Sequence, residues 1–73
     1  MIINVQKEIY EGWTVGDFIA DLEPLCDLIM SGGAIEKPFR TRAELADWTK
    51  SNQPYYKKVI PEVVEYFAAK YNL

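Results

Sequence analysis

The sequence predicts an all-α fold, a small compact irregular bundle of three to four helices in a single domain over residues 1–73. Two observations support this prediction. Helix-capping motifs at Thr14 and Thr41 each precede residues whose apolar positions recur every three or four residues, which is the period of a helix. Between these segments stand residues that end helices, such as Gly32 and Gly33.

The opening segment, residues 2–13, has two interpretations. Its apolar residues fit a helical period at Ile2, Val5, Ile9 and Trp13. They also fit the alternation of a strand at Ile3, Val5 and Ile9, with a break at Lys7. A strand needs a partner strand, and no other segment of the sequence resembles one. We therefore expect a helix here.

The next segment predicts a helix from about residue 15 to residue 30. The motif that precedes it resembles a capping box with Asp17 in place of the usual Glu. Its apolar stripe consists of Val15, Phe18, Leu22, Leu25 and Ile29. Pro24 lies inside the pattern, and a proline there removes one backbone donor and crowds the preceding turn. We expect Pro24 to kink or break the helix.

The C-terminal part of the chain predicts further helices. A capping box begins at Thr41 and predicts a short helix over about 42–51. Pro54 suits the first turn of another helix, but Pro61 interrupts the apolar pattern that follows. Two alternatives remain open: one kinked helix that begins near Pro54, or a short turn followed by a helix over 61–72.

The composition supplies few of the residues that enzymes use. The chain has no histidine and one cysteine, Cys26, so no intrachain disulfide and no zinc site of the usual Cys/His kind is expected. Cys26 lies on the apolar stripe and is expected to be a buried small hydrophobe. The carboxylate pairs Asp17/Asp21 and Glu23/Asp27 are interpreted as solvated surface. We predict no catalytic residue, no cofactor and no metal, and therefore no enzyme.

The same features bear on the compartment. No apolar run reaches the length of a membrane span, and the first residues lack the basic and apolar stretches of a signal peptide. A single thiol is typical of proteins in a reducing environment. We expect a soluble cytoplasmic protein without a membrane partner.

The charges are divided unevenly along the chain. Residues 1–36 carry one basic and seven acidic side chains, whereas residues 37–73 carry seven basic and four acidic ones. The whole chain has a formal net charge of −3. An acidic half and a basic half favour partners of opposite charge, including a second copy of the chain.

Two surfaces are predicted to contact another protein. Helical projection places Leu28 nearly opposite the core stripe of its helix, among acidic residues. On the last helix, Tyr55, Tyr66 and Leu73 extend the apolar stripe sideways beyond what so small a domain can bury. We predict a non-catalytic protein-interaction module that self-associates, as a homodimer for example, or binds a larger protein.

Two alternatives involve nucleic acid. The basic segment 37–58 surrounds two helices joined by a turn, an order that resembles a helix-turn-helix, and its candidate DNA contacts are Lys50, Lys57 and Lys58. Alternatively, Asp17, Asp21 and Asp27 mimic nucleic acid and inhibit a protein that binds it. Few side chains in the basic segment suit base reading, so the protein-interaction module is preferred.

Overall fold

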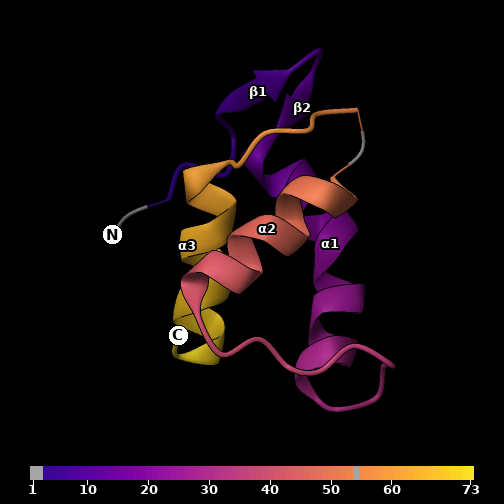
Figure 1. The fold of residues 1–73 in the computed structure, drawn as a ribbon. Coiled ribbons are helices and arrows are strands. Elements are labelled where there is room, and N and C mark those ends of the chain that lie inside the picture. Colours follow the sequence, from indigo (N-terminus) through magenta and orange to yellow (C-terminus); the bar gives the residue numbers. More distant parts are fainter. Residues whose placement is uncertain (1–2, 54) are drawn as a thin grey trace.

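The computed structural model describes residues 3–53 and 55–73, which form a small antiparallel sheet and three helices (Figure 1). The elements are β1 (Glu8–Tyr10), β2 (Trp13–Thr14), α1 (Val15–Met30), α2 (Arg42–Asn52) and α3 (Pro61–Tyr71). The prediction of an all-α bundle of three to four helices is therefore wrong, because the N-terminal segment forms a two-stranded sheet beside the three helices of the described residues. The predictions for Ile2 and Pro54 lie outside the described residues.

The N-terminal segment forms a β-hairpin where we expected a helix. Its strands are joined by Glu11 and Gly12, which have φ values of 46° and 85°. Positive φ at both central residues is what a type I′ hairpin turn requires, and it is incompatible with a continuing helix. The partner strand, β2, has two residues. A strand of that length shows no alternation in a sequence, so the pairing could not be recognised there.

The residues before the hairpin are held against the start of α1. The amide of Val15 donates to the carbonyl of Lys7 at 2.9 Å, and the amide of Gly16 donates to the carbonyl of Val5 at 2.8 Å. These bonds satisfy first-turn donors that have no partner inside the helix. A Cβ atom on Gly16 would lie 3.1 Å from the Val5 carbonyl oxygen, so the close approach depends on glycine.

Helix α1 has the predicted bounds. The Thr14 side chain accepts from the amide of Asp17, and the Asp17 carboxylate accepts from the amide of Thr14, which completes the capping box. After the helix, Gly32 adopts a φ of 83° and its amide donates to the carbonyl of Ile29. Pro24 lies inside α1 without ending it, so the predicted break is wrong.

The other two helices also follow their local signals. Helix α2 begins at the predicted capping box, in which Thr41 and Glu44 bond reciprocally. Helix α3 begins with Pro61 in its first turn and ends at Asn72, which has the left-handed conformation of a helix C-cap. Residues 55–60 are not helical. The structure therefore selects the alternative with a turn before Pro61, and the single kinked helix is wrong.

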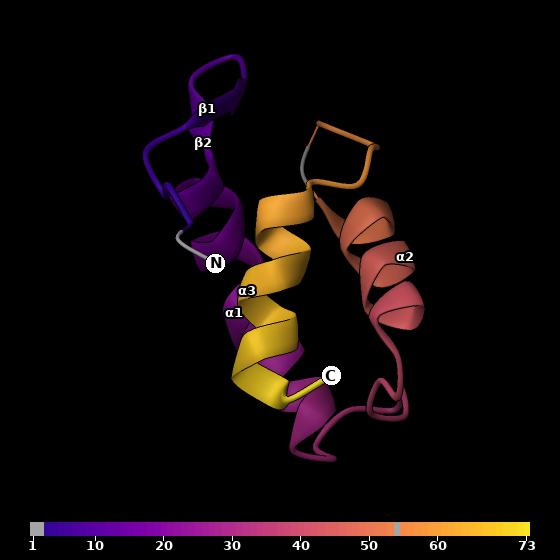
Figure 2. The same ribbon diagram turned by 90° about the vertical axis from the view of Figure 1, so that its left-hand side faces the viewer.

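Helix α3 is the centre of the packing. It contacts both α1 and α2. Figure 2 shows α2 beside α3 and the hairpin at one end of the molecule. The buried apolar side chains come from all three helices and from Ile60: Val15, Phe18, Ile19, Leu22, Cys26, Ile29, Leu45, Ile60, Val63, Val64, Phe67 and Ala68. Because α3 borders both neighbours, its apolar residues hold the whole domain together.

Within the described part of the chain, no helix combines the length and the hydrophobicity that crossing a bilayer requires.

Candidate functional site

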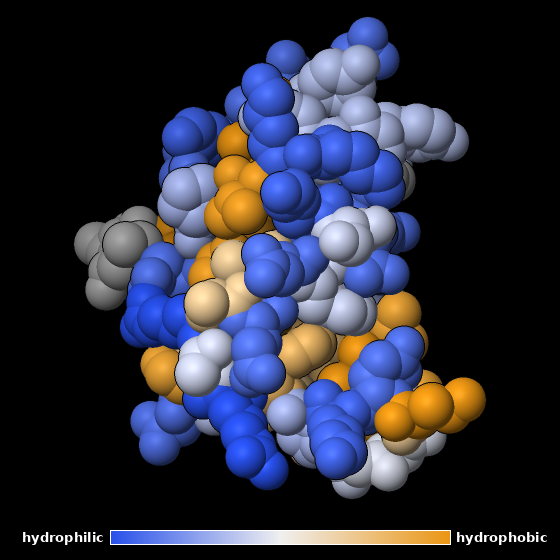
Figure 3. Space-filling model, viewed as in Figure 1, coloured by the Kyte–Doolittle hydropathy of each residue, from blue (hydrophilic) through white to orange (hydrophobic). Residues whose placement is uncertain are grey.

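Helix α1 buries one side in the core and exposes the opposite side. We call the exposed residues Asp17, Ala20, Asp21, Pro24, Leu25 and Leu28 the α1 outer face. Leu25 is 42% exposed and Leu28 is 47% exposed. The prediction that Leu25 belongs to the core stripe of the helix is therefore wrong. In the connector after the helix, Ile35 is fully exposed. Figure 3 shows hydrophobic surface gathered at the lower right of the view, where Figure 1 places the C-terminal end of α1 and this connector.

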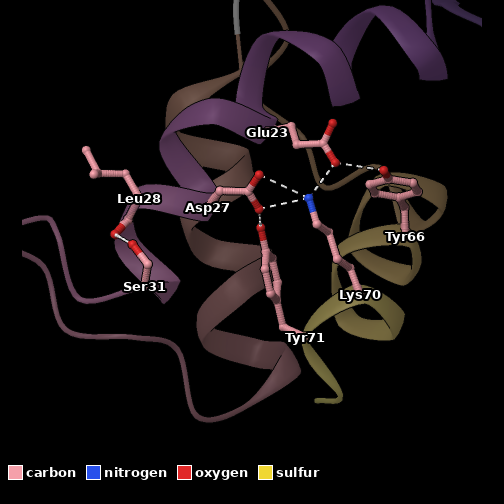
Figure 4. Close-up of polar contacts among 7 residues, drawn as sticks. All are labelled: Glu23, Asp27, Leu28, Ser31, Tyr66, Lys70 and Tyr71. Atoms are coloured by element: carbon pink, nitrogen blue, oxygen red, sulfur yellow. Dashed lines mark hydrogen bonds and ion pairs between the residues drawn. The ribbon is translucent and has the colours of Figure 1, made fainter.

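The exposed leucine at position 28 has a defined position. The Leu28 carbonyl accepts from the Ser31 hydroxyl at 3.0 Å and from the Gly33 amide at 2.9 Å. A Cβ on Gly33 would lie 2.7 Å from Leu28 Cδ1, so the glycine lets the chain fold against this side chain. Figure 4 shows Leu28 pointing away from α3, as helical projection predicted. The outer face therefore ends in an exposed apolar side chain, against which the start of the connector folds.

At its N-terminal end the outer face borders a shallow pocket beside the hairpin. Its lining residues are Glu11, Gly12, Trp13, Asp17, Ala20 and Asp21. The indole of Trp13 contacts Phe18 of the core, with the ring centroids 5.2 Å apart, so this wall of the pocket is anchored. The outer face is thus acidic near the hairpin and apolar near the C-terminal end of α1.

The side of α1 that borders α3 carries a polar cluster (Figure 4). The Lys70 ammonium lies 2.8 Å from Glu23 Oε2 and 2.9 Å from Asp27 Oδ1. The Tyr66 hydroxyl donates to Glu23 at 2.7 Å, and the Tyr71 hydroxyl donates to Asp27. Glu23 and Asp27 are 29% and 47% exposed, so they lie at the surface, but they also bind side chains of α3, which the sequence did not predict.

The pKa values of the cluster all move away from neutrality. Hydrogen bonds from Lys70 and Tyr66 lower the pKa of Glu23, and those from Tyr71 and Lys70 lower the pKa of Asp27. The hydrogen bonds to Glu23 and Asp27 raise the pKa of Lys70. Burial is the main cause that raises the pKa of Tyr71, and its hydrogen bond to Asp27 raises it further. Each group therefore keeps its ordinary charge near pH 7, as expected of groups that join two helices.

The polar cluster predicts how stability depends on pH. The folded-state pKa values of Glu23 and Asp27 lie below their ordinary values of 4.5 and 3.8. Their contribution to the stability of the fold is therefore fully present at pH values above these ordinary pKa values. It is lost as the pH falls through the lowered folded-state values. We expect the melting temperature to fall on acidification, and Lys70→Met should reduce that fall because it removes the shared ammonium. Thermal denaturation of the parent protein and of Lys70→Met, between neutral pH and about pH 3, measures how far the melting temperature of each one falls.

Lys37→Met is the matched control for this experiment. Lys37 is exposed and makes no salt bridge among the described residues. Its variant should keep the acid-induced fall of the parent protein. An equal fall in the parent and in Lys70→Met would show that the polar cluster does not carry the pH dependence.

Cys26 is buried and free, as the sequence predicted. Burial raises the pKa of its thiol to about 11, so the thiol stays protonated at neutral pH. Among the described residues, no group of three His, Cys, Asp or Glu side chains is placed to hold a metal ion.

The residues predicted to extend the last helix do not form one surface. Tyr55 lies in the loop before α3 and is 79% exposed. Tyr66 is partly buried and bonded to Glu23 across the helix interface. Leu73 is partly buried against the core, and its carbonyl accepts from Arg42. The prediction of a shared stripe is therefore wrong, and Tyr55 is the well-exposed member of the three.

The basic residues are also arranged differently from a helix-turn-helix. Between α2 and α3, Gln53 and residues 55–60 lie outside any helix, which makes a connection longer than the turn of that motif, and Lys57 and Lys58 lie in it. The Lys57 ammonium donates to the carbonyls of Ser51 and Gln53, at the C-terminal end of α2. Lys50 lies in the last turn of α2. The expectation that Lys57 and Lys58 begin a recognition helix is wrong.

The polar cluster and the buried Gln53 were not predicted from the sequence. The signal for the cluster was present: Glu23 and Asp27 are four residues apart, as are Tyr66 and Lys70. Spacings of four place side chains on one face of a helix, so two such faces match when the helices are neighbours. Gln53 gave no sequence signal, because its role depends on the path of the loop that follows it.

Comparison of the chain with protein-family models, curated proteins and solved structures found no match.

Proposed function

We propose that the protein is a non-catalytic protein-interaction module that binds its partner through the α1 outer face. The observation that carries the proposal is the exposure of Leu25 and Leu28 at the C-terminal end of that face, and Ile35 in the connector that follows is also exposed. The partner is a second copy of the chain or a different protein. We place the module in the cytoplasm, since its one cysteine is a free buried thiol.

The spacing of these residues supports binding through a helix face. Asp21, Leu25 and Leu28 follow one another at intervals of four and three residues, the pattern by which one side of a helix contacts a groove in its partner. Burying a half-exposed leucine removes apolar surface from water and yields a favourable free energy. The acidic residues near the hairpin add charge that selects basic partners and orients them.

The two nucleic-acid alternatives have less support. The candidate DNA contacts are Lys50, Lys57 and Lys58. The Lys57 ammonium donates to two backbone carbonyls of its own chain, which compete with a phosphate for it. The acidic inhibitor was argued from Asp17, Asp21 and Asp27, and Asp27 is paired with Lys70 and Tyr71 instead of pointing along the outer face. Each alternative therefore loses one of its three charged contacts.

The proposal predicts that Leu28→Glu abolishes partner binding while the domain stays folded. A carboxylate at this position loses apolar contact and is desolvated when the partner covers it. The measurement is affinity capture from an extract of the host, with the parent chain and the variant immobilised in parallel. We expect the proteins held by the parent, further copies of this chain included, to be absent from the variant.

Ala69→Glu is the matched control. Ala69 is exposed and lies in the last turn of α3, as Leu28 lies in the last turn of α1, so both variants add a carboxylate near a helix C-terminus. The Ala69 variant should capture the same proteins as the parent. Equal capture by the Leu28 and Ala69 variants would show that the outer face is not the binding surface.

A further inference from the structure

A second surface of the molecule complements the α1 outer face. The loop between α2 and α3 exposes Tyr55 and Val59 beside the basic side chains of Lys57 and Lys58. We call residues 55–59 the basic loop. It combines apolar side chains with positive charge, whereas the outer face combines apolar side chains with negative charge.

The basic loop is held in one conformation. The buried Gln53 amide donates to the carbonyls of Tyr56 and Lys58 at 2.9 and 2.7 Å. Tyr56 packs its ring against Tyr10 and Phe18, with the ring centroids 5.6 and 6.2 Å away. Tyr55 has a φ of 60°, a strained value for a bulky residue that persists where the surroundings determine it. The loop is therefore organised to present Tyr55 outward.

The charges of the two surfaces are not paired with each other within one chain. The salt bridges among the described residues join Lys7 to Glu62, Arg42 to Glu65, and Lys70 to Glu23 and Asp27. Asp21 and Lys58 take part in none of them. Figure 1 places the basic loop and the C-terminal end of α1 at opposite ends of the molecule, so the loop of one chain cannot cover its own leucines.

We propose that the partner of the α1 outer face is a second copy of this chain, whose basic loop binds there. This inference rests on the proposed function and names its partner. In a two-fold dimer each copy offers both surfaces, so the contact between acidic face and basic loop is made twice. Charge complementarity orients the two copies, and burial of Tyr55, Leu25 and Leu28 supplies the apolar contact.

Charge exchange tests the proposal. Asp21→Lys alone should weaken the dimer about tenfold, because it places two like charges together at each of two contacts. Lys58→Glu alone should do the same. An equimolar mixture of the two variants should restore dimers, since both contacts between unlike copies again join opposite charges. Sedimentation equilibrium of the parent, each variant and the mixture, over a range of concentrations, measures this.

Salt provides a second readout that needs no variant. Raising the salt concentration from about 0.01 M to about 1 M shortens the Debye length from about 30 Å to about 3 Å, so dimerisation of the parent should weaken. Far-ultraviolet circular dichroism should give the same helix content for both variants, because Asp21 and Lys58 are exposed. The Lys58 carbonyl that binds Gln53 is unchanged by the substitution.

Two results would overturn the inference. A parent chain that stays monomeric at the highest attainable concentration rules out the second copy as partner. A dimer whose variants fail to recover on mixing uses other surfaces. In either case, loss of capture by Leu28→Glu and its retention by Ala69→Glu would leave the proposed function standing, with a different protein as the partner.

Discussion

Replacing Phe67 by alanine should unfold the domain at ordinary temperatures. Phe67 is fully buried on α3, the helix that contacts both α1 and α2. Its ring stacks on Tyr71 at a centroid distance of 6.2 Å and meets Tyr66 edge-on at 5.3 Å. Truncating a buried phenylalanine costs about 3–5 kcal/mol, which is comparable with the whole stability of a domain of this size.

Urea denaturation followed by far-ultraviolet circular dichroism measures this loss. Lys37→Ala is the control, because it also truncates a large side chain, but an exposed one outside the two proposed contact surfaces. Its effect on the free energy of unfolding should stay within about 0.5 kcal/mol, as for other surface positions. A Phe67 variant that unfolds cooperatively near the midpoint of the parent would contradict the central role of α3.

Replacing Gln53 by glutamate should be almost as damaging, although it hardly changes the volume of the side chain. The Gln53 side chain is fully buried and its amide nitrogen donates to the carbonyls of Tyr56 and Lys58. Its amide oxygen has no hydrogen-bond partner among the described residues. A carboxylate would face two acceptors without a donor, and an uncompensated buried charge costs about 3–5 kcal/mol at neutral pH.

The sign of the pH dependence identifies this mechanism. Burial raises the folded-state pKa of the introduced carboxyl group, so the protonated acid is tolerated at low pH and the loss of stability grows as the pH rises above about 4.3. Gln6→Glu is the control, since Gln6 is exposed and its side chain makes no hydrogen bond among those described. The difference between the two variants in thermal denaturation should shrink on acidification. A difference independent of pH would exclude a buried charge as its cause.

Local sequence signals predicted the helices well. The bounds of α1 were predicted correctly, and those of α2 to within one residue, because each begins at a capping box that satisfies its own first-turn donors. Gly32 follows the end of α1 and Pro61 begins α3, and both positions were predicted from the backbone preferences of these residues. The exposure of Leu28 also followed from helical geometry, since it depends on its angle to the residues of its own helix.

The errors occurred where a structure depends on contacts between separate segments of the chain. The spacing of Ile9 and Trp13 is compatible with both a helix and the hairpin. The hairpin forms because the chain turns at Gly12 and because residues 5–7 hydrogen-bond to the start of α1. The same holds for Tyr66 and Leu73, which the helical wheel placed at the edge of the apolar stripe. Their surroundings come from Glu23 and Arg42 on other helices.

The amino-acid sequence by itself therefore determined where the helices begin and end, that Cys26 is buried, and that one side of α1 faces outward. These properties depend on neighbours within a few residues, where hydrogen bonds and side-chain spacing follow from the chain itself. The tertiary structure decided which charges are paired and which stay free: Glu23 and Asp27 bind α3, whereas Asp21 and Lys58 form no salt bridge among the described residues. Ion pairs and hydrogen bonds across helices act over a few ångströms, so they depend on how the helices pack.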